Sequence, residues 1–426
     1  MTDVRPDPLT ESPCGCAEDT RLSLSRRGLL AGAAGLVAAG VATSVPTQYA
    51  WADPGYRGDV LVVLSLRGGF DGLSAVAPVA DAAYVKARPT IGLQQSQALM
   101  LDRTFGLHPS LKALKPFWDA KSLAFVHAVG QTSPTRSHFK AMEDMENAAP
   151  GSTLRTGWLD RMLGATASPS TFTGVAFGPS PRALQGPFNE LSIRGVDQLS
   201  LSGAGSASDS ARWRTVLAAV NSNAPAHVRV PTTAALAAFG TATKMKEAGY
   251  TPRAGVTYPG DELGGALRDV ARLVKQGVGL RAAAVDFGGW DTHAGMGNAA
   301  KGFMRDHLGR LAAALAAFWT DLGAEQSRVT VITLSEFGRR LTENASGGLD
   351  HGHGNLAMVL GGGVNGGKVY GSWPGLASSA LVDGDLAGTT DYRTILAEVM
   401  ERRQKLTAST VFPGVGSSRL GLVRAA

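Results

Sequence analysis

Five stretches of the chain are continuous apolar runs rich in β-branched residues. They span residues 59–66, 122–129, 281–287, 328–337 and 356–363. Apolar runs without polar alternation are typical of strands buried on both faces, as in a parallel sheet. These runs therefore predict the strands of a central sheet.

Helical patterns separate the later runs. Residues 261–277 and 299–322 repeat apolar side chains at the 3.6-residue spacing of an amphipathic helix. Residues 391–403 form the last predicted helix, with Asp391 as its N-cap. Strands that alternate with helices predict an α/β fold, a three-layer sandwich with a mainly parallel central sheet.

The stretch 150–258 has a different character. It is rich in Gly, Ser, Pro and Ala, with short apolar runs and helical patterns near 208–221 and 232–247. We interpret it as a cap or insertion over the main sheet. The expected organisation is an N-terminal segment, residues 1–52, followed by one α/β domain over 53–426 that carries this insertion.

The N-terminal segment has the features of an export signal. It contains "SRRGLL" at 25–30, an uncharged stretch over 28–45, and "AWA" at 50–52. Paired arginines, a weakly apolar stretch and a small-x-small site are typical of a twin-arginine signal peptide. A transmembrane anchor is the alternative, but alanine and glycine make this segment a poor one. We expect export by the twin-arginine translocase to the periplasm, cell envelope or exterior, without a permanent membrane span.

Cysteine usage and charge narrow the class of protein. Both cysteines, Cys14 and Cys16, precede the paired arginines, so cleavage after Ala52 would leave no disulfide and no cysteine nucleophile. The formal net charge is +6, without a Lys/Arg block. We therefore expect no nucleic-acid partner.

Polar residues gather where the predicted strands end. They are Asp71 after the first strand, Thr132, Ser133, Arg136 and His138 after the second, Asp291 and His293 after the third, and Glu336 after the fourth. Ligands of open α/β sheets sit outside the carboxyl ends of the strands. The segment "DHGHG", 350–354, precedes the fifth strand and joins the others only if that strand is antiparallel.

These residue types suit a metal site. Carboxylates and neutral imidazoles bind zinc and harder ions such as manganese. Asp291 and His293 face one side of an extended chain, and His351 and His353 share their spacing. Arg136 could bind phosphate or sulfate through two parallel hydrogen bonds.

Each of these features also has a structural interpretation. An isolated Asp-x-His could be a turn, and Asp350 could cap one. Glu336 could form a surface ion pair with Arg339 and Arg340. Three further histidines are interpreted structurally: His127 in the core, His108 fixing a loop ahead of a helix, and His307 in solvent.

The ordered motifs resemble a known family. They are "LRGGFDGLSAVAP", "LHPSL", "RSHFKAMEDME", "GWDTH", "SEFGRR" and "DHGHGN". In this order after a twin-arginine signal, they resemble the exported bacterial proteins grouped as domain of unknown function 1501, over nearly all of the mature chain. That family is related in fold to the alkaline phosphatase and sulfatase superfamily. The resemblance implies a parallel sheet with metal ligands at the strand ends.

The resemblance also implies roles for individual residues. The implied ligands of a divalent ion (zinc, calcium or manganese) are Asp71, Asp291, His293 and either His351 or His353. The resemblance places Thr132 at the nucleophile position, with Arg136 as its partner. In our leading hypothesis Thr132 or Ser133 attacks, Arg136 binds the anion, and Glu336 or His138 transfers protons. Glu146 lies on the same helical face as His138 and could hold it.

Two departures from the superfamily pattern leave two hypotheses open. Thr132 cannot be oxidised to formylglycine, and Glu336-Phe337 stands where an Asp-His pair is expected. The first hypothesis is an exported metal-dependent hydrolase of a phosphate or sulfate ester, acting on a small molecule or glycan. The second is a catalytically inactive protein of this fold that binds a ligand or an exported partner.

Overall fold

The computed structural model describes residues 56–166, 172–188, 191–200 and 206–426. The predicted export signal, residues 1–52, lies outside these ranges. Within them, no helix combines the length and the apolar character needed to cross a membrane.

A nine-stranded sheet forms the centre of the described chain, in the order β11-β5-β10-β9-β1-β8-β6-β7, with β14 paired to β5. The strands are β1 (Val60–Ser65), β5 (Leu123–Gly130), β6 (Gly174–Phe177), β7 (Leu191–Ile193), β8 (Ala282–Asp286), β9 (Val329–Leu334), β10 (Asn355–Gly361), β11 (Val369–Tyr370) and β14 (Thr390–Asp391). All of them run in one direction except β10, which is antiparallel to both its neighbours. The five predicted strands are confirmed as β1, β5, β8, β9 and β10.

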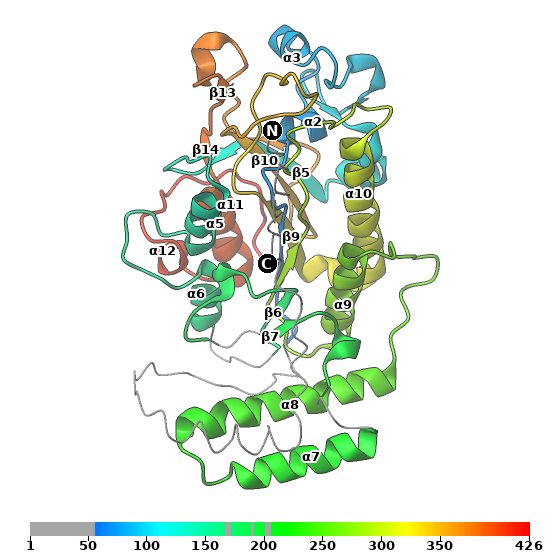
Figure 1. Ribbon diagram of the computed structural model, residues 1–426, viewed down its shortest axis with the longest axis vertical. Helices are drawn as coiled ribbons and strands as arrows, with labels where there is room; N and C mark the ends of the chain where they lie inside the picture. The colour runs from blue at the N-terminus through cyan, green and yellow to red at the C-terminus, as the bar shows by residue number, and fades with distance from the viewer. Residues whose placement is uncertain (1–55, 167–171, 189–190, 201–205) are drawn as a thin grey trace, which may run out of the picture. The chain divides into compact units, whose positions relative to one another are not determined.

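Helices cover both faces of the sheet (Figure 1). One face carries α9 (Glu262–Gln276) and α10 (Phe303–Leu322), and the other carries α5 (His138–Asn147), α6 (Trp158–Gly164), α11 (Tyr392–Val399) and α12 (Ala408–Val411). Asp391 caps α11, as predicted, by accepting a hydrogen bond from the Arg393 amide at 2.9 Å. The predicted three-layer α/β sandwich is therefore confirmed.

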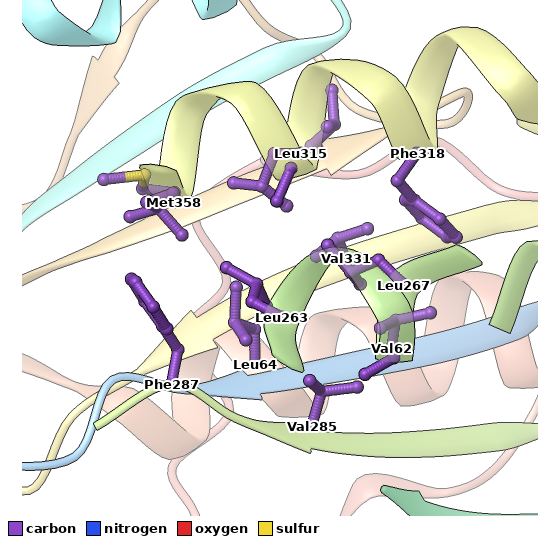
Figure 2. Packing of buried hydrophobic residues seen from close by; sticks show 14 of the residues in the cluster. Val62, Leu64, Leu263, Leu267, Val285, Phe287, Leu315, Phe318, Val331 and Met358 are labelled. Atoms are coloured by element: carbon purple, nitrogen blue, oxygen red, sulfur yellow. The ribbon is translucent and has the colours of Figure 1, made fainter. Parts of the chain in front are cut away.

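Alternation along the strands produces two hydrophobic cores. In β1, Val62 and Leu64 join the core beneath α9 and α10, whereas Leu61 and Val63 join the core on the other face. Figure 2 shows the first core, where leucines of α9 and α10 pack against β1, β8 and β9. Each fully buried aliphatic side chain contributes roughly 1.5–3 kcal/mol. This burial explains why the strand runs are mostly apolar.

The stretch 150–258 is only partly an insertion. Its strands β6 and β7 extend the main sheet beside β8, and its helix α6 packs in the second core. Only α7 (Ala207–Val220) and α8 (Ala226–Ala248) form a separate helical pair. α8 begins before its predicted start near 232, because Pro231 sits in an early turn where its missing N–H costs a single hydrogen bond.

Small elements complete the described chain. They are α2 (Gly72–Ala75), α3 (Ala82–Ala87), α4 (Lys115–Asp119), a three-stranded sheet of β2 (Val76–Ala77), β4 (Gly106–Leu107) and β3 (Leu99–Met100), and a hairpin of β12 (Leu381–Val382) and β13 (Asp385–Leu386). Several of them flank the loops at the carboxyl edge of the main sheet. The hairpin supplies a residue that anchors two of these loops.

Candidate metal-binding site

Loops from five strands meet at the carboxyl edge of the main sheet. β1, β5, β8 and β9 end at this edge, and β10 begins there because it runs antiparallel. The histidine loop before β10 was expected at this edge only if β10 were antiparallel, and β10 is antiparallel. The loop reaches residues that follow β5, β8 and β9.

Three imidazoles and one carboxylate converge at this edge. The Nε2 atom of His351 lies 3.0 Å from that of His138 and 3.0 Å from that of His293. The Asp291 Oδ1 atom lies 3.1 Å from His293 Nε2, 3.2 Å from His351 Nε2 and 3.5 Å from His138 Nε2. The four side chains come from three separate loops and place four ligand-type atoms together.

The other ring nitrogen of each histidine is already engaged. His138 Nδ1 lies 2.8 Å from Glu336 Oε1, and His293 Nδ1 lies 3.0 Å from Asp350 Oδ1. His351 Nδ1 lies 2.8 Å from the backbone carbonyl of Arg136. Carbonyl and carboxylate oxygens accept hydrogen bonds, so each Nδ1 carries the proton and donates. The Nε2 atom of each ring is then the one that faces the cluster and can bind an ion.

This donor set fits a divalent ion. Tetrahedral zinc at about 2.0 Å from its ligands places them about 3.3 Å apart, close to the 3.0–3.5 Å measured between adjacent atoms of the cluster. Imidazoles that donate their second N–H to a carboxylate or a carbonyl are typical of metal ligands. His138, Asp291 and His351 already place their ligand atoms within 4.8 Å of one another. The residues therefore fit a metal with His138, His293, His351 and Asp291 around it.

Arg339 fixes the carboxylate of the cluster. This arginine is 1% exposed, and its guanidinium donates to Asp291 Oδ1 at 2.6 Å and to the carbonyls of Leu349 and Gly69 at 3.0 and 2.7 Å. Partial burial raises the pKa of Asp291, but the hydrogen bond and charge of Arg339 outweigh it and lower the pKa to about 2. Asp291 is therefore ionised at neutral pH. The interpretation of Arg339 as part of a surface ion pair was wrong.

Glycines allow the two arms of the segment between β9 and β10 to pack backbone against backbone. Arg339 and His351 form an antiparallel bridge, and the Gly352 amide donates to the Gly338 carbonyl at 2.8 Å. A Cβ atom on Gly352 would lie 2.4 Å from the carbonyl carbon of Arg339. Gly68, at φ +112°, likewise approaches the Asp291 amide. Close approach explains why the histidine loop is so rich in glycine.

Glu336 lies behind His138 and not at the surface. It is 3% exposed and accepts hydrogen bonds from the Gly68 amide at 2.8 Å and from the Ser335 hydroxyl at 3.0 Å. With the bond to His138, these contacts occupy its carboxylate. Glu146, the predicted partner of His138, instead pairs with Arg67 at 2.7 Å. Glu336 therefore positions the imidazole that Glu146 was expected to hold.

Asp385 clamps two loops of the site. It is fully buried on β13 and pairs with the guanidinium of Arg136 and with Arg340 Nε, the latter at 3.1 Å. The Arg136 carbonyl holds His351, and the Arg340 amide donates to the Asp350 carbonyl at 3.0 Å. Arg136, predicted to bind an anion, thus has its side chain engaged by a carboxylate. No sequence motif pointed to Asp385.

Two predicted metal ligands lie outside the cluster. Both Asp71 oxygens accept from the fully buried Arg88, at 2.6 and 3.0 Å, so a buried ion pair takes the place of the predicted metal bond. The His353 imidazole lies against the backbone of Gly130 and Gly388. Burial lowers the pKa of His353, which keeps the ring neutral in this packed position. The two-residue spacing therefore brings only His351 to the cluster.

The predicted nucleophiles are exposed and unassisted. Thr132 and Ser133 lie on the surface of the loop between β5 and α5. Within the described ranges, neither hydroxyl is hydrogen-bonded to a histidine or a carboxylate. A hydroxyl nucleophile needs such a base, so this arrangement does not activate either residue.

The remaining histidines have structural roles. His127 is fully buried, with Nε2 2.7 Å from the Val76 carbonyl, and His108 Nδ1 accepts from the Ser110 amide at 3.1 Å, both as interpreted from the sequence. His307, expected in solvent, is 3% exposed and stacks on Phe287 with ring centroids 4.2 Å apart. The interpretation of His307 was therefore wrong.

Comparisons with known proteins give one family and several distant structures. A family model described as "Protein of unknown function (DUF1501)" matches residues 59–410. No match to a curated protein was found. The match covers more than half of the chain, and the six family motifs quoted above all lie within it.

Similar solved structures include three bacterial proteins. The phosphonate monoester hydrolase of Agrobacterium radiobacter is 10% identical, with 85% of this chain and 78% of that chain covered and a TM-score of 0.35. The PsFucS1 sulfatase from Pseudoalteromonas sp. is 11% identical, with 86% and 73% covered and a TM-score of 0.36. The lipoteichoic acid synthase LtaP from Listeria monocytogenes is 9% identical, with 71% and 65% covered and a TM-score of 0.29. These likenesses are distant, so chemistry has to be inferred from the side chains of this chain.

Proposed function

Since the chain belongs to the DUF1501 family of unknown function, its activity has to be inferred from its own site, and we propose a metal-dependent hydrolase of a phosphate or sulfate ester. The main support is the convergence of three imidazole Nε2 atoms whose Nδ1 atoms are already engaged. Such a cluster offers acceptors only, and one divalent cation satisfies all of them. His138, His293 and His351 would hold the ion, with Asp291 as the fourth group. The imidazole-rich set favours zinc over calcium.

The cluster is open on one side. The side chains of Asp291 and His293 are 47% and 45% exposed, whereas Glu336 is buried behind His138. A divalent ion held there supplies a Lewis acid that polarises an ester oxygen. An ester would approach from the exposed side, while Glu336 and Arg339 hold His138 and Asp291 in place from behind.

Charge at the rim favours an anionic substrate. Arg136 and Arg340 are 47% and 41% exposed and share one carboxylate, Asp385. Both guanidiniums keep solvent-exposed surface beside the cluster. Exposed guanidinium N–H groups of this kind can donate to a phosphate or sulfate group.

Water is the proposed nucleophile. The hydroxyls of Thr132 and Ser133 have no base within the described chain, so a protein nucleophile is not supported. We expect a Thr132→Ala variant to retain activity. The substrate, a small-molecule or glycan ester, would be met outside the cytoplasm after twin-arginine export, as the N-terminal pattern predicts.

The absence of an activated hydroxyl also supports a second candidate function. In that case the protein binds a metal and a ligand or an exported partner without turnover. Metal binding is common to both functions, so turnover separates them.

The first experiment is elemental analysis of the purified protein. We expect about one zinc or manganese per chain, lost in His138→Ala and in Asp291→Ala, because either change removes a group from the cluster. His227→Ala is the matched control, since His227 is exposed on α8. A wild-type protein without stoichiometric metal after loading with zinc or manganese would contradict the metal site.

A screen of phosphate and sulfate monoesters and diesters then tests hydrolysis. We expect turnover by wild type, Thr132→Ala and His227→Ala, and none by Asp291→Ala. If the metal-loaded wild type hydrolyses no ester, the binding function replaces the hydrolase.

A further inference from the structure

A second polar cavity lies at the opposite edge of the sheet. It has a volume of about 510 Å³ and is lined by residues that precede β1, β8 and β9, by residues at the end of the turn that follows α11, and by Ala425 and Ala426. Because β1, β8 and β9 are parallel, their amino ends stand at the edge away from the histidine cluster. The volume is in the range of small-molecule sites, roughly 300–1,000 Å³.

The walls of this cavity are strongly basic. The lining cations are Arg57, Arg281, Arg328, Arg403 and Lys405, and the lining carboxylate side chain is Asp59. Asp59 accepts from Arg403 Nη2 at 2.5 Å, and Arg328 is paired outside the cavity with Glu325 at 2.5 Å. Across the described ranges, Arg57, Arg281 and Lys405 have no carboxylate partner within ion-pair distance. The cavity therefore has an excess of positive charge.

Two buried guanidinium nitrogens of the wall lack a partner. Arg403 is 8% exposed, and its Nε atom is buried without a hydrogen bond among the described residues. The Arg281 Nε atom is likewise buried without a hydrogen bond among the described residues. The guanidinium of Arg281 stacks on the Tyr56 ring, 3.8 Å from its centroid. An unpaired buried donor costs about 1–3 kcal/mol.

We propose that this cavity binds a tetrahedral oxyanion, phosphate or sulfate, either free or at the end of a larger molecule. Guanidinium groups offer paired N–H donors that match such an anion. Arg281 would bind with its plane fixed by Tyr56, Arg403 would contribute from the wall, and Lys405 would add charge from the exposed side. The site is independent of the proposed hydrolase.

Titration calorimetry of the full chain with sodium phosphate tests the proposal. Sodium chloride at the same ionic strength is the control ligand. We expect about tenfold weaker phosphate binding in Arg281→Ala, because a primary donor is lost. A second variant, Lys405→Gly, protects the test against misfolding, since Lys405 has φ +56° and glycine relieves that strain. It should bind phosphate several-fold more weakly. Arg212→Ala, which removes one charge from the exposed face of α7, should bind like wild type.

Two results would overturn the proposal. One is equal phosphate binding by all four proteins, which would locate the anion elsewhere, including at the histidine cluster. The other is no phosphate binding by wild type beyond that of chloride. The source of the anion is distinguished by repeating the titration with glycerol 3-phosphate. Binding of both ligands supports a terminal phosphate on a larger molecule, and binding of inorganic phosphate alone supports the free ion.

Discussion

Single hydrogen bonds determine which face of each imidazole is available in the cluster. Glu336, Asp350 and the Arg136 carbonyl each accept a hydrogen bond from one Nδ1 atom. Sequence motifs pointed to the imidazoles because aspartate and histidine follow predicted strands at short spacing. They could not identify the three acceptors, since hydrogen-bond partners more than 50 residues apart depend on how the loops fold.

Glu336→Gln tests this orientation at the scale of one atom. The amide keeps the size of the side chain but loses the negative charge that supports the His138 ring. We expect metal affinity to fall about 10- to 100-fold, as is usual when such a partner is lost, in a chelator competition assay. Glu401→Gln, which removes an acid paired with Arg419 far along the chain, should leave the affinity unchanged. Equal affinities for wild type and Glu336→Gln would argue against the orienting role.

Asp71 and His353 show the limit of motif spacing at the same scale. Each lies at the expected strand end, but Asp71 is paired with Arg88 and the His353 ring packs against backbone. A buried arginine partner cannot be recognised from a sequence, because Arg88 is separated from its carboxylate by α2, β2 and α3.

At the scale of elements, Asp385 on the β12–β13 hairpin holds two loops of the site in place. This carboxylate links the loop that precedes α5 to the loop that precedes β10 through Arg136 and Arg340. The hairpin was not predicted, since two-residue strands leave no periodic pattern. β6 and β7 were not predicted either, because they are also too short to show a clear period. The long runs of β1, β5 and β9 were identified.

Asp385→Asn should loosen both loops together. The variant keeps the shape of the residue but leaves two arginines without their shared charge. Stability should fall by only about 1 kcal/mol, because both arginine side chains are more than 40% exposed and water compensates their charge. We expect weaker metal binding and, in the apo protein, faster amide hydrogen exchange across 131–137 and 338–351. Exchange that increases uniformly along the chain would show general destabilisation and contradict the clamp. Asp391→Asn, which removes a carboxylate paired with Arg393 elsewhere in the fold, serves as the control.

Stability of the whole molecule should depend on pH through its buried histidines. Burial lowers the pKa of His127, His108 and His307 to about 4, from an ordinary value of 6.5. Between these values the unfolded chain binds protons that the folded chain does not, so stability is complete above pH 6.5 and is lost as the pH falls towards 4. The loss from pH 6.5 to pH 5 is on the order of 2 kcal/mol per histidine.

Urea denaturation at several pH values, with a chelator present, measures this dependence. His127→Gln should be less stable at pH 7 but should lose less stability on acidification, because a neutral amide does not titrate. His227→Gln, on an exposed helix position, should follow wild type. An unchanged acid slope in His127→Gln would refute the assignment.

The fold as a whole was more predictable than the site. Burial on both faces leaves a strong signal in apolar runs, and the helices between them carry the 3.6-residue period. The site depends on one antiparallel strand, β10, whose direction no local pattern encodes. His307 was misread because its helix has polar neighbours on the surface side, while the ring itself turns towards Phe287.

The antiparallel direction of β10 has an evolutionary consequence. The segment 335–354 leaves β9 and enters β10 at the same edge of the sheet, and it carries Glu336, Arg339, Asp350 and His351. Half of the site is thus one uninterrupted stretch of gene whose two ends are anchored on neighbouring strands. A single recombination event, or a loop graft in the laboratory, can exchange that half while leaving the sheet beneath it intact.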